Sequence, residues 1–243
     1  MSEHKDDDDS PAAARLPDLA SDITASAAGA LIGIVLAGPA GALAGAATGP
    51  LAKATIEIAT ASLRARNRRT QAALEQAIKL VEDQPRPLEE LLIRDEERLD
   101  VAIAALNSAA ASSVEAKLEA LGACIARAAT LERVSDVERL GLLVKALADL
   151  EAVHLAVLSH LADRQAGYAV TPTQLESDLR LPAEELRPVV RQLELNGLIL
   201  DQGRFEAQPA AVKWELSGLG RLCVALLRGN LSDEDIGQGD ERD

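Results

Sequence analysis

Residues 23–52 read ITASAAGALIGIVLAGPAGALAGAATGPLA and contain no charged side chain. Gly29 and Gly33 are four residues apart, and Gly41, Gly45 and Gly49 repeat that interval. Because residues four apart lie on one face of a helix, these glycines form a flat strip that a second helix can approach closely. The Gly-Pro pair at positions 38 and 39 is a natural break. The segment therefore predicts two short apolar helices paired in a hairpin.

Glycine strips of this kind, called glycine zippers, are typical of membrane helices and membrane-active hairpins. A membrane span needs about 20 mostly apolar residues to cross about 30 Å of hydrocarbon, and this segment is long enough. Its strongly apolar residues are few, and each contributes only about −0.3 to −0.6 kcal/mol, which the glycines and prolines largely offset. The sequence predicts marginal insertion. It leaves open whether residues 23–52 enter a bilayer or pack in a protein core.

Basic residues follow the apolar segment, within reach of lipid headgroups if this part of the chain is helical. Such clusters attract anionic lipid at about 1 kcal/mol per residue near the membrane surface. The alternative is a solvated helix face, or a set of cationic partners for acidic helices further along the chain. The candidate residues for lipid headgroups or an acidic partner are Lys53, Arg64, Arg66, Arg68 and Arg69.

The composition favours a mainly α fold. Of the 243 residues, 48% are hydrophobic but only 1% are aromatic, so the core must consist of Ala, Leu, Val and Ile. Such a core favours closely packed helices over sheets. The net charge of −14 is concentrated at the two ends, because residues 1–22 and residues 229–243 each carry a net charge of −5. We expect disordered, solvated acidic tails over residues 1–22 and 230–243.

A helical bundle is predicted over residues 53–148, because apolar residues recur there at helical spacing between clear breaks. Proline suits the first turn of a helix, and serine suits the position before it. These signals predict helices over residues 50–83 and 88–111, a helix capped by the serines at 112 and 113, and a further stretch from residue 135 that is one long helix or two.

Residues 149–229 form a second predicted domain. The expected order is a short helix, a strand at 168–170, a helix capped by Thr171, a helix after Pro182, strands at 198–200 and 212–216, and a helix capped by Ser217. With the motifs LRLPAEEL (179–186), QLELNGLI (192–199) and KWELSGLGRL (213–222), this order resembles the winged-helix family. The last motif is similar to the strand-then-helix ending of MarR-like regulators. The resemblance implies DNA binding through the third helix, in the major groove.

The charges of this domain depart from that pattern. The start of the expected recognition helix carries Glu184 and Glu185, which repel phosphates, and residues 150–229 hold ten acids against eight bases. Arg187, Arg191 and Arg204 are the candidate nucleic-acid contacts. Because a strong DNA reader presents a basic face, protein contact or self-association is the preferred interpretation, and DNA binding is the alternative.

Catalytic and metal-binding motifs are missing from the sequence. The histidines at positions 154 and 160 are six residues apart, which does not place them together on a helix. There is no CxxC, HExxH, GxSxG or phosphate-binding loop, and the two cysteines, Cys124 and Cys223, indicate a reducing compartment or no disulfide role. The acidic residues at 89–97 are most simply ion-pair partners of nearby arginines. We expect no enzyme activity, no metal and no cofactor.

These observations predict a non-enzymatic bacterial protein, of an effector or toxin-like kind, that associates with a membrane or with other copies through residues 23–52. Its winged helix would contact a protein partner. The first alternative is a winged-helix transcription regulator that binds DNA, and the second is a scaffold that assembles by helix packing. We expect a cytoplasmic location, with peripheral association or insertion at the inner membrane.

Overall fold

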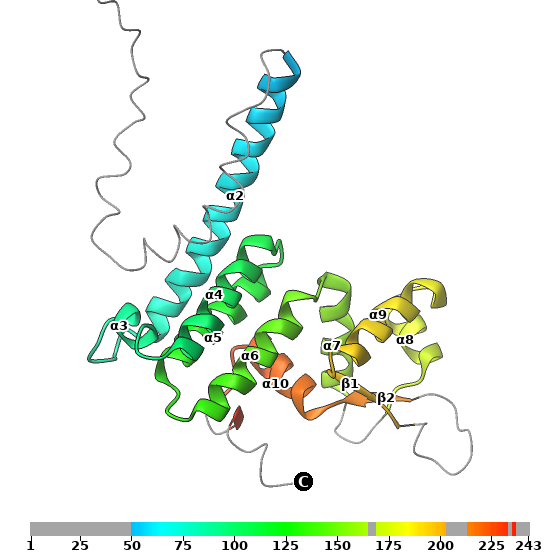
Figure 1. Cartoon of the computed structure of the whole chain (residues 1–243). Coiled ribbons are helices and arrows are strands. Elements are labelled where there is room, and N and C mark those ends of the chain that lie inside the picture. Colours follow the sequence, from blue (N-terminus) through cyan, green and yellow to red (C-terminus); the bar gives the residue numbers. More distant parts are fainter. Residues whose placement is uncertain (1–49, 165–168, 203–212, 233–234, 237–243) are drawn as a thin grey trace, which may run out of the picture.

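The computed structural model describes residues 50–164, 169–202, 213–232 and 235–236, and for residues 50–60 the backbone alone (Figure 1). The predicted mainly α fold is confirmed for this part of the chain, in which a small two-stranded sheet accompanies the helices. The apolar hairpin expected at residues 23–52 lies outside the described residues, apart from the backbone at its last three positions. In chain order the elements are α2 (Pro50–Leu80), α3 (Leu88–Leu92), α4 (Glu96–Ala111), α5 (Glu115–Thr130), α6 (Val134–Ala148), α7 (Ala152–Asp163), α8 (Pro172–Leu179), α9 (Ala183–Leu195), β1 (Ile199–Asp201), β2 (Trp214–Leu216) and α10 (Gly218–Leu227).

The helices α2, α4, α5 and α6 pack together as a bundle. α2 contacts α4 and α5, and α4 also contacts α6. Small side chains fill these interfaces, and Ala73, Ala77 and Ala105 are fully buried. At Gly122 a Cβ atom would stand 2.5 Å from the backbone oxygen of Ala73, so α5 and α2 approach to backbone contact. A core almost without aromatic residues fills its volume by bringing the helices closer together.

The first half of α2 stands clear of this bundle (Figure 1). Among the residues of α2 whose side chains are described, Thr70 is the first that is buried, and residues 61–69 are all exposed or half-buried. Residues 50–68 therefore form a projecting arm, about 28 Å long at 1.5 Å per residue. We call this segment the α2 arm.

The starts of α4, α5 and α6 follow a common register. These helices begin at Glu96, Glu115 and Val134, which are 19 residues apart. In this register Arg98 and Lys117 occupy the same position, and each donates hydrogen bonds to backbone carbonyls at the C-terminal end of the next helix along the chain. Carbonyls at a helix C-terminus lack partners within the helix and attract cations. In this register, one cation contacts the C-terminal end of α5 and one contacts that of α6.

The segment 88–111 is not the single helix that its periodicity predicts. α3 ends at Leu92 and α4 begins at Glu96, with the backbone of Asp95 extended between them. The carboxylate of Asp95 pairs with Arg98 at 2.6 Å, and an acidic residue is stabilised just ahead of a helix N-terminus. The prediction that Asp95 and its acidic neighbours include an ion-pair partner of Arg98 is confirmed.

The serine caps were predicted with mixed success. Ser112 ends α4 instead of starting α5, and its hydroxyl accepts a hydrogen bond from the Val114 amide in the connecting turn. The stretch from residue 135 forms two helices, because α6 ends at Ala148 and α7 begins at Ala152. Ser217 caps α10 as predicted, accepting from the amide of Gly220.

The remaining elements pack beside the bundle, and α10 bridges the two parts by contacting α5, α6 and α7. β1 and β2 pair antiparallel with Ile199 opposite Leu216, and Val170 forms a single bridge to Trp214 in place of the expected strand at 168–170. The predicted cap of α8 is confirmed, because Thr171 and Gln174 bond reciprocally at its start.

Candidate functional site

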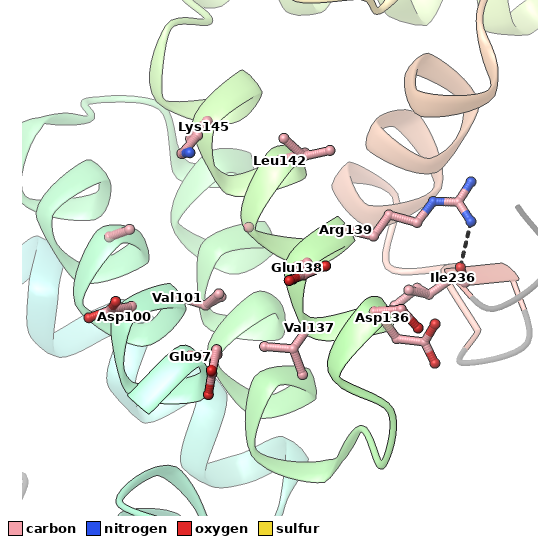
Figure 2. A pocket seen from close by; sticks show the side chains of 13 residues that line it. Glu97, Asp100, Val101, Asp136, Val137, Glu138, Arg139, Leu142, Lys145 and Ile236 are labelled. Atoms are coloured by element: carbon pink, nitrogen blue, oxygen red, sulfur yellow. Dashed lines mark hydrogen bonds between the residues drawn. The ribbon is translucent and has the colours of Figure 1, made fainter. Parts of the chain in front are cut away.

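A groove with a cavity volume of about 810 Å³ lies between α4 and α6 (Figure 2). Its floor is apolar. Val101 and Val137 are buried beneath it, whereas Leu142 is 54% exposed within it. Gly141 leaves space in the floor on the α6 side, where an added Cβ atom would meet only Val101, at 3.5 Å. An exposed leucine over a buried valine layer is a surface that an apolar side chain of another segment can cover.

Carboxylates surround this floor on both walls. Glu97 and Asp100 lie on α4, and Asp136 and Glu138 lie on α6 (Figure 2). Within the described part of the chain, none of these four carboxylates forms an ion pair or a side-chain hydrogen bond. The rim of the groove is therefore an acidic surface around an apolar strip, with its carboxylates available to an external cation.

The C-terminal segment closes one end of the groove. Ile236 is fully buried against it, and the guanidinium of Arg139 donates to the Ile236 carbonyl at 2.6 Å (Figure 2). Leu231 is also buried, and Arg127 donates to its carbonyl. We call the described residues of this segment, 231–232 and 235–236, the C-terminal strap. This differs from the expectation of a solvated tail over residues 230–243, since two apolar residues of that region lie in the core.

Hydrogen bonds join two polar residues of the strap. The amide and the hydroxyl of Ser232 both donate to the carboxylate of Asp235, at 2.9 and 2.6 Å. These hydrogen bonds lower the pKa of Asp235 by favouring its charged form. Arginines of the bundle thus hold Leu231 and Ile236, and hydrogen bonds join Ser232 to Asp235.

A buried polar cluster lies at the junction of α5, α6 and α7. Lys117 is 4% exposed, and its ammonium donates to the carbonyls of Leu150 at 2.6 Å and Ala148 at 3.2 Å. Burial lowers the pKa of Lys117, and the carboxylates of Asp149 and Glu151 partly oppose that shift. Two carbonyls at the end of α6 thus hold a buried cation in place.

The histidine of this cluster is a structural residue. His154 accepts a hydrogen bond at Nδ1 from the amide of Glu151, 3.0 Å away, and so completes the capping box that begins α7. Burial lowers the pKa of His154. The cysteines at 124 and 223 are free and buried, and burial raises the pKa of the Cys223 thiol to about 12 and that of Cys124 well above its ordinary range. Groups held in these states are suited to packing and not to nucleophilic attack.

The structure divides the predicted arginine cluster. Arg69 donates to the carbonyl of Ala110 at 3.4 Å, at the C-terminal end of α4, so it belongs to the bundle. Arg66 is half-buried, whereas Arg64 and Arg68 are exposed, one turn apart on the α2 arm. Of Lys53 only the backbone is described. The glycines at 29, 33, 41, 45 and 49 lie outside the described residues.

The candidate nucleic-acid residues fall on and near α9. Arg187 and Arg191 are exposed beside a hollow of about 360 Å³ between α8 and α9. Arg191 is already paired with Glu194 at 3.2 Å, and the Trp214 indole also donates to that carboxylate, at 3.1 Å. The third candidate, Arg204, lies outside the described residues. The structure therefore places two of the three residues beside one hollow, and the Glu194 carboxylate there contacts both Arg191 and Trp214.

No family model, no curated protein and no solved structure matches this chain. Within the described ranges, no helix is both long and apolar enough to cross a bilayer, and no three His, Cys, Asp or Glu side chains gather as a metal site. The fold and the groove thus define only a class, a mainly α protein with a projecting helix and an acidic groove.

The groove and the strap were not predicted from the sequence. Every groove residue except Ile236 lies on α4 or α6, and the 19-residue register of the helices is the sequence signal that would have aligned them. Ile236 had no comparable signal, because it is a single apolar residue among acidic neighbours.

Proposed function

We propose that this chain is a non-enzymatic protein that holds its apolar segment, residues 23–52, away from its helical body and uses that segment to associate with a membrane. The observation that carries the proposal is the α2 arm. α2 begins at Pro50, within the end of the apolar segment, and continues without a break into the bundle (Figure 1). The point at which the apolar segment joins α2 therefore lies at the far end of the arm, away from the helical body.

The exposed charges of the α2 arm support this proposal. Among the arginines of the cluster, Arg64 and Arg68 are exposed, and they follow the apolar segment on the same helix. Each basic residue near an anionic membrane surface contributes about 1 kcal/mol of attraction. The apolar segment would insert marginally, and the arginines would add an electrostatic contribution that salt weakens.

Liposome flotation tests the proposal. We expect the full chain to float with vesicles of phosphatidylcholine and phosphatidylglycerol, and a chain lacking residues 23–49 to remain at the bottom of the gradient. The variant Gly41→Leu with Gly45→Leu should also fail to float, because leucine blocks the close approach of the two helices. Equal flotation of the deleted and full chains would refute the proposal.

The arginine contribution has a matched control. Arg64→Gln with Arg68→Gln should reduce flotation on anionic vesicles, by roughly tenfold or more in the lipid concentration required, since two contributions of about 1 kcal/mol are removed. Arg86→Gln with Arg94→Gln removes the same charge from exposed positions on the body and should leave flotation unchanged. If both pairs act equally, the effect is one of net charge and not of the arm.

For an effector of this kind, we also expect expression of the full chain to slow the growth of a bacterial host. The chain lacking residues 23–49 should be harmless at the same protein level. Growth arrest by the deleted chain would place any toxicity in the helical body.

The C-terminal region supports a second part of the proposal, that residues 149–229 are a winged-helix module that contacts protein. The order of α7, α8, α9, a hairpin and α10, with the bridge at Val170, supports the family resemblance. The first turn of α9 carries Glu184 and Glu185, both exposed, and its last turn leaves Leu195 64% exposed. Carboxylates at one end and an apolar side chain at the other suit a protein surface better than a phosphate backbone.

DNA binding remains the alternative that the fold order favours, and it has a direct test. A DNA-binding module would shift genomic fragments at low salt, with binding lost in Arg187→Ala with Arg191→Ala and reduced steeply by added salt. We expect no such shift. A salt-sensitive shift that depends on these arginines would replace the protein-contact interpretation.

A further inference from the structure

We infer that the groove between α4 and α6 receives the α2 arm of a second copy of this chain. The groove needs a partner that presents cations around an apolar strip, because carboxylates on both walls surround an apolar floor. A helix enters such a groove with one apolar face down and with its charged side chains reaching the rim. The α2 arm is such a helix within the chain itself, because its charged residues are mostly basic and its uncharged residues are mostly Ala, Ile and Leu.

The charges of the two surfaces are complementary. The α2 arm, residues 50–68, carries four basic residues and one acidic residue, Glu57. Four carboxylates and two basic residues line the groove, and one of the latter, Arg139, is already engaged by the carbonyl of Ile236. Opposite potentials on two surfaces give an association both its specificity and a faster encounter rate.

The spacing of the charges also corresponds. Arg64 and Arg68 are one helical turn apart, about 6 Å along the helix axis. Glu97 and Asp100 on α4 are separated by a similar rise of about 4.5 Å. Both arginines line one hollow of the arm together with Ala61 and Asn67, so they lie on the same face of the helix.

The arm of the same molecule is not available to its own groove. The second half of α2 packs against α4 and α5, and the helix continues straight from that contact into the arm (Figure 1). Reaching the α4–α6 groove would require α2 to break. The arm must therefore enter the groove of another molecule, in a head-to-tail contact that builds rings or open chains. This inference does not rest on the membrane association proposed above, but both proposals use Arg64 and Arg68, and a groove variant that keeps these arginines distinguishes the two.

Charge reversal tests the inference with an internal rescue. One variant of the full chain carries Arg64→Glu and Arg68→Glu on the arm, and the other carries Asp100→Arg and Glu138→Arg, one on each wall of the groove. All four positions are exposed and outside the first turn of their helices, so both variants should keep the helical circular dichroism of the native chain. Sedimentation velocity in detergent micelles, at low salt and over a range of concentrations, measures the association.

We expect the native chain to associate in a salt-sensitive manner and each variant alone to associate at least tenfold more weakly. An equal mixture of the two variants should recover the native association, because every arm in the mixture then finds a groove of opposite charge. The control Arg86→Glu with Arg94→Glu should behave like the native chain. Association that neither variant weakens, or that the mixture fails to recover, would overturn the inference.

Leu142→Ser provides a second measurement that involves no charge. Leu142 is half-exposed in the floor of the groove and does not belong to the core, so its replacement should weaken association by roughly tenfold without lowering the thermal midpoint. Flotation separates this inference from the proposed function. The groove variant should still float with vesicles. If the native full chain associated with itself but did not float, the membrane proposal alone would be refuted.

Discussion

Two glycines at matched positions of neighbouring helices should respond oppositely to the same substitution. Gly122 is the eighth residue of α5, and Gly141 is the eighth residue of α6. A Cβ atom at Gly122 would lie 2.5 Å from the Ala73 oxygen and 2.8 Å from the Cβ of Gln76, whereas at Gly141 the nearest atom is 3.5 Å away, on Val101. We predict that Gly141→Ala stabilises the protein and that Gly122→Ala destabilises it.

The magnitudes follow from two effects. Alanine is favoured over glycine in a helix interior by about 0.8–1.0 kcal/mol, a gain that both variants share. Only Gly122→Ala also overpacks an interface, because the backbone of α2 must move by roughly 1 Å to restore heavy-atom separations near 3.5 Å. Overpacking costs about 1–3 kcal/mol. The free energy of unfolding should therefore rise by about 1 kcal/mol in Gly141→Ala and fall by about 1 kcal/mol in Gly122→Ala.

Urea unfolding followed by circular dichroism at 222 nm measures both values under the same conditions. In thermal unfolding, a difference of about 2 kcal/mol between the variants corresponds to about 4–8 °C for a protein of this size. The two substitutions have the same chemistry and the same helix position, so each serves as the control for the other. If Gly122→Ala stabilised the protein as much as Gly141→Ala, then α2 and α5 would not be in backbone contact.

Three further predictions concern buried groups. Burial lowers the pKa of Lys117, so the unfolded chain binds this proton more tightly than the folded chain does. Over the pH range just below 10.5, the free energy of unfolding of the native chain should therefore rise with pH. The variant Lys117→Met should show less of that rise. Equal pH dependence of the two chains would contradict the buried ammonium. Because both thiols are buried with raised pKa values, Cys124 and Cys223 should react with a thiol reagent such as dithionitrobenzoate only after unfolding, and rapid labelling of the native protein would show an open core. Ile236→Ala should cost about 2 kcal/mol or more of local stability at the C-terminal strap, seen as faster amide hydrogen exchange in residues 231–236, and unchanged exchange would mean that Ile236 does not hold the strap.

The sequence predicts best those features that one or two neighbouring residues determine. Pro50 begins α2, Thr171 with Gln174 caps α8, and Ser217 caps α10, each through a local hydrogen bond or a fixed backbone angle. The break at Asp95 was missed although its signal is also local, because apolar spacing on both sides of it continued the helical pattern. Asp95 is a residue type that favours the N-cap position, but the acidic residues that follow it give it no distinct signal.

The candidate site could not be predicted in the same way. The groove depends on which faces of α4 and α6 meet, and an alanine-rich helix offers several faces of nearly equal apolarity. The strap depends on contacts between residues about a hundred positions apart, namely Arg127 with Leu231 and Arg139 with Ile236. Neither the acidic composition of residues 230–243 nor their length carries that information.

The cations of this fold fall into two groups, those that contact helix ends in the bundle and those that remain exposed on the α2 arm. Arg69, Arg98 and Lys117 each direct their charge at carbonyls near a helix C-terminus, one for each of α4, α5 and α6. Closely packed helices without aromatic side chains leave little room for water at these ends, so a cation from the neighbouring helix satisfies carbonyls that would otherwise be buried without partners. Removing any of these three should therefore affect stability. The exposed pair Arg64 and Arg68 contacts no such carbonyl. Because both side chains remain solvated, their position on the arm costs little folding free energy. A change there should leave folding intact and alter only what the arm contacts, which makes this pair the most direct test of function in the described chain.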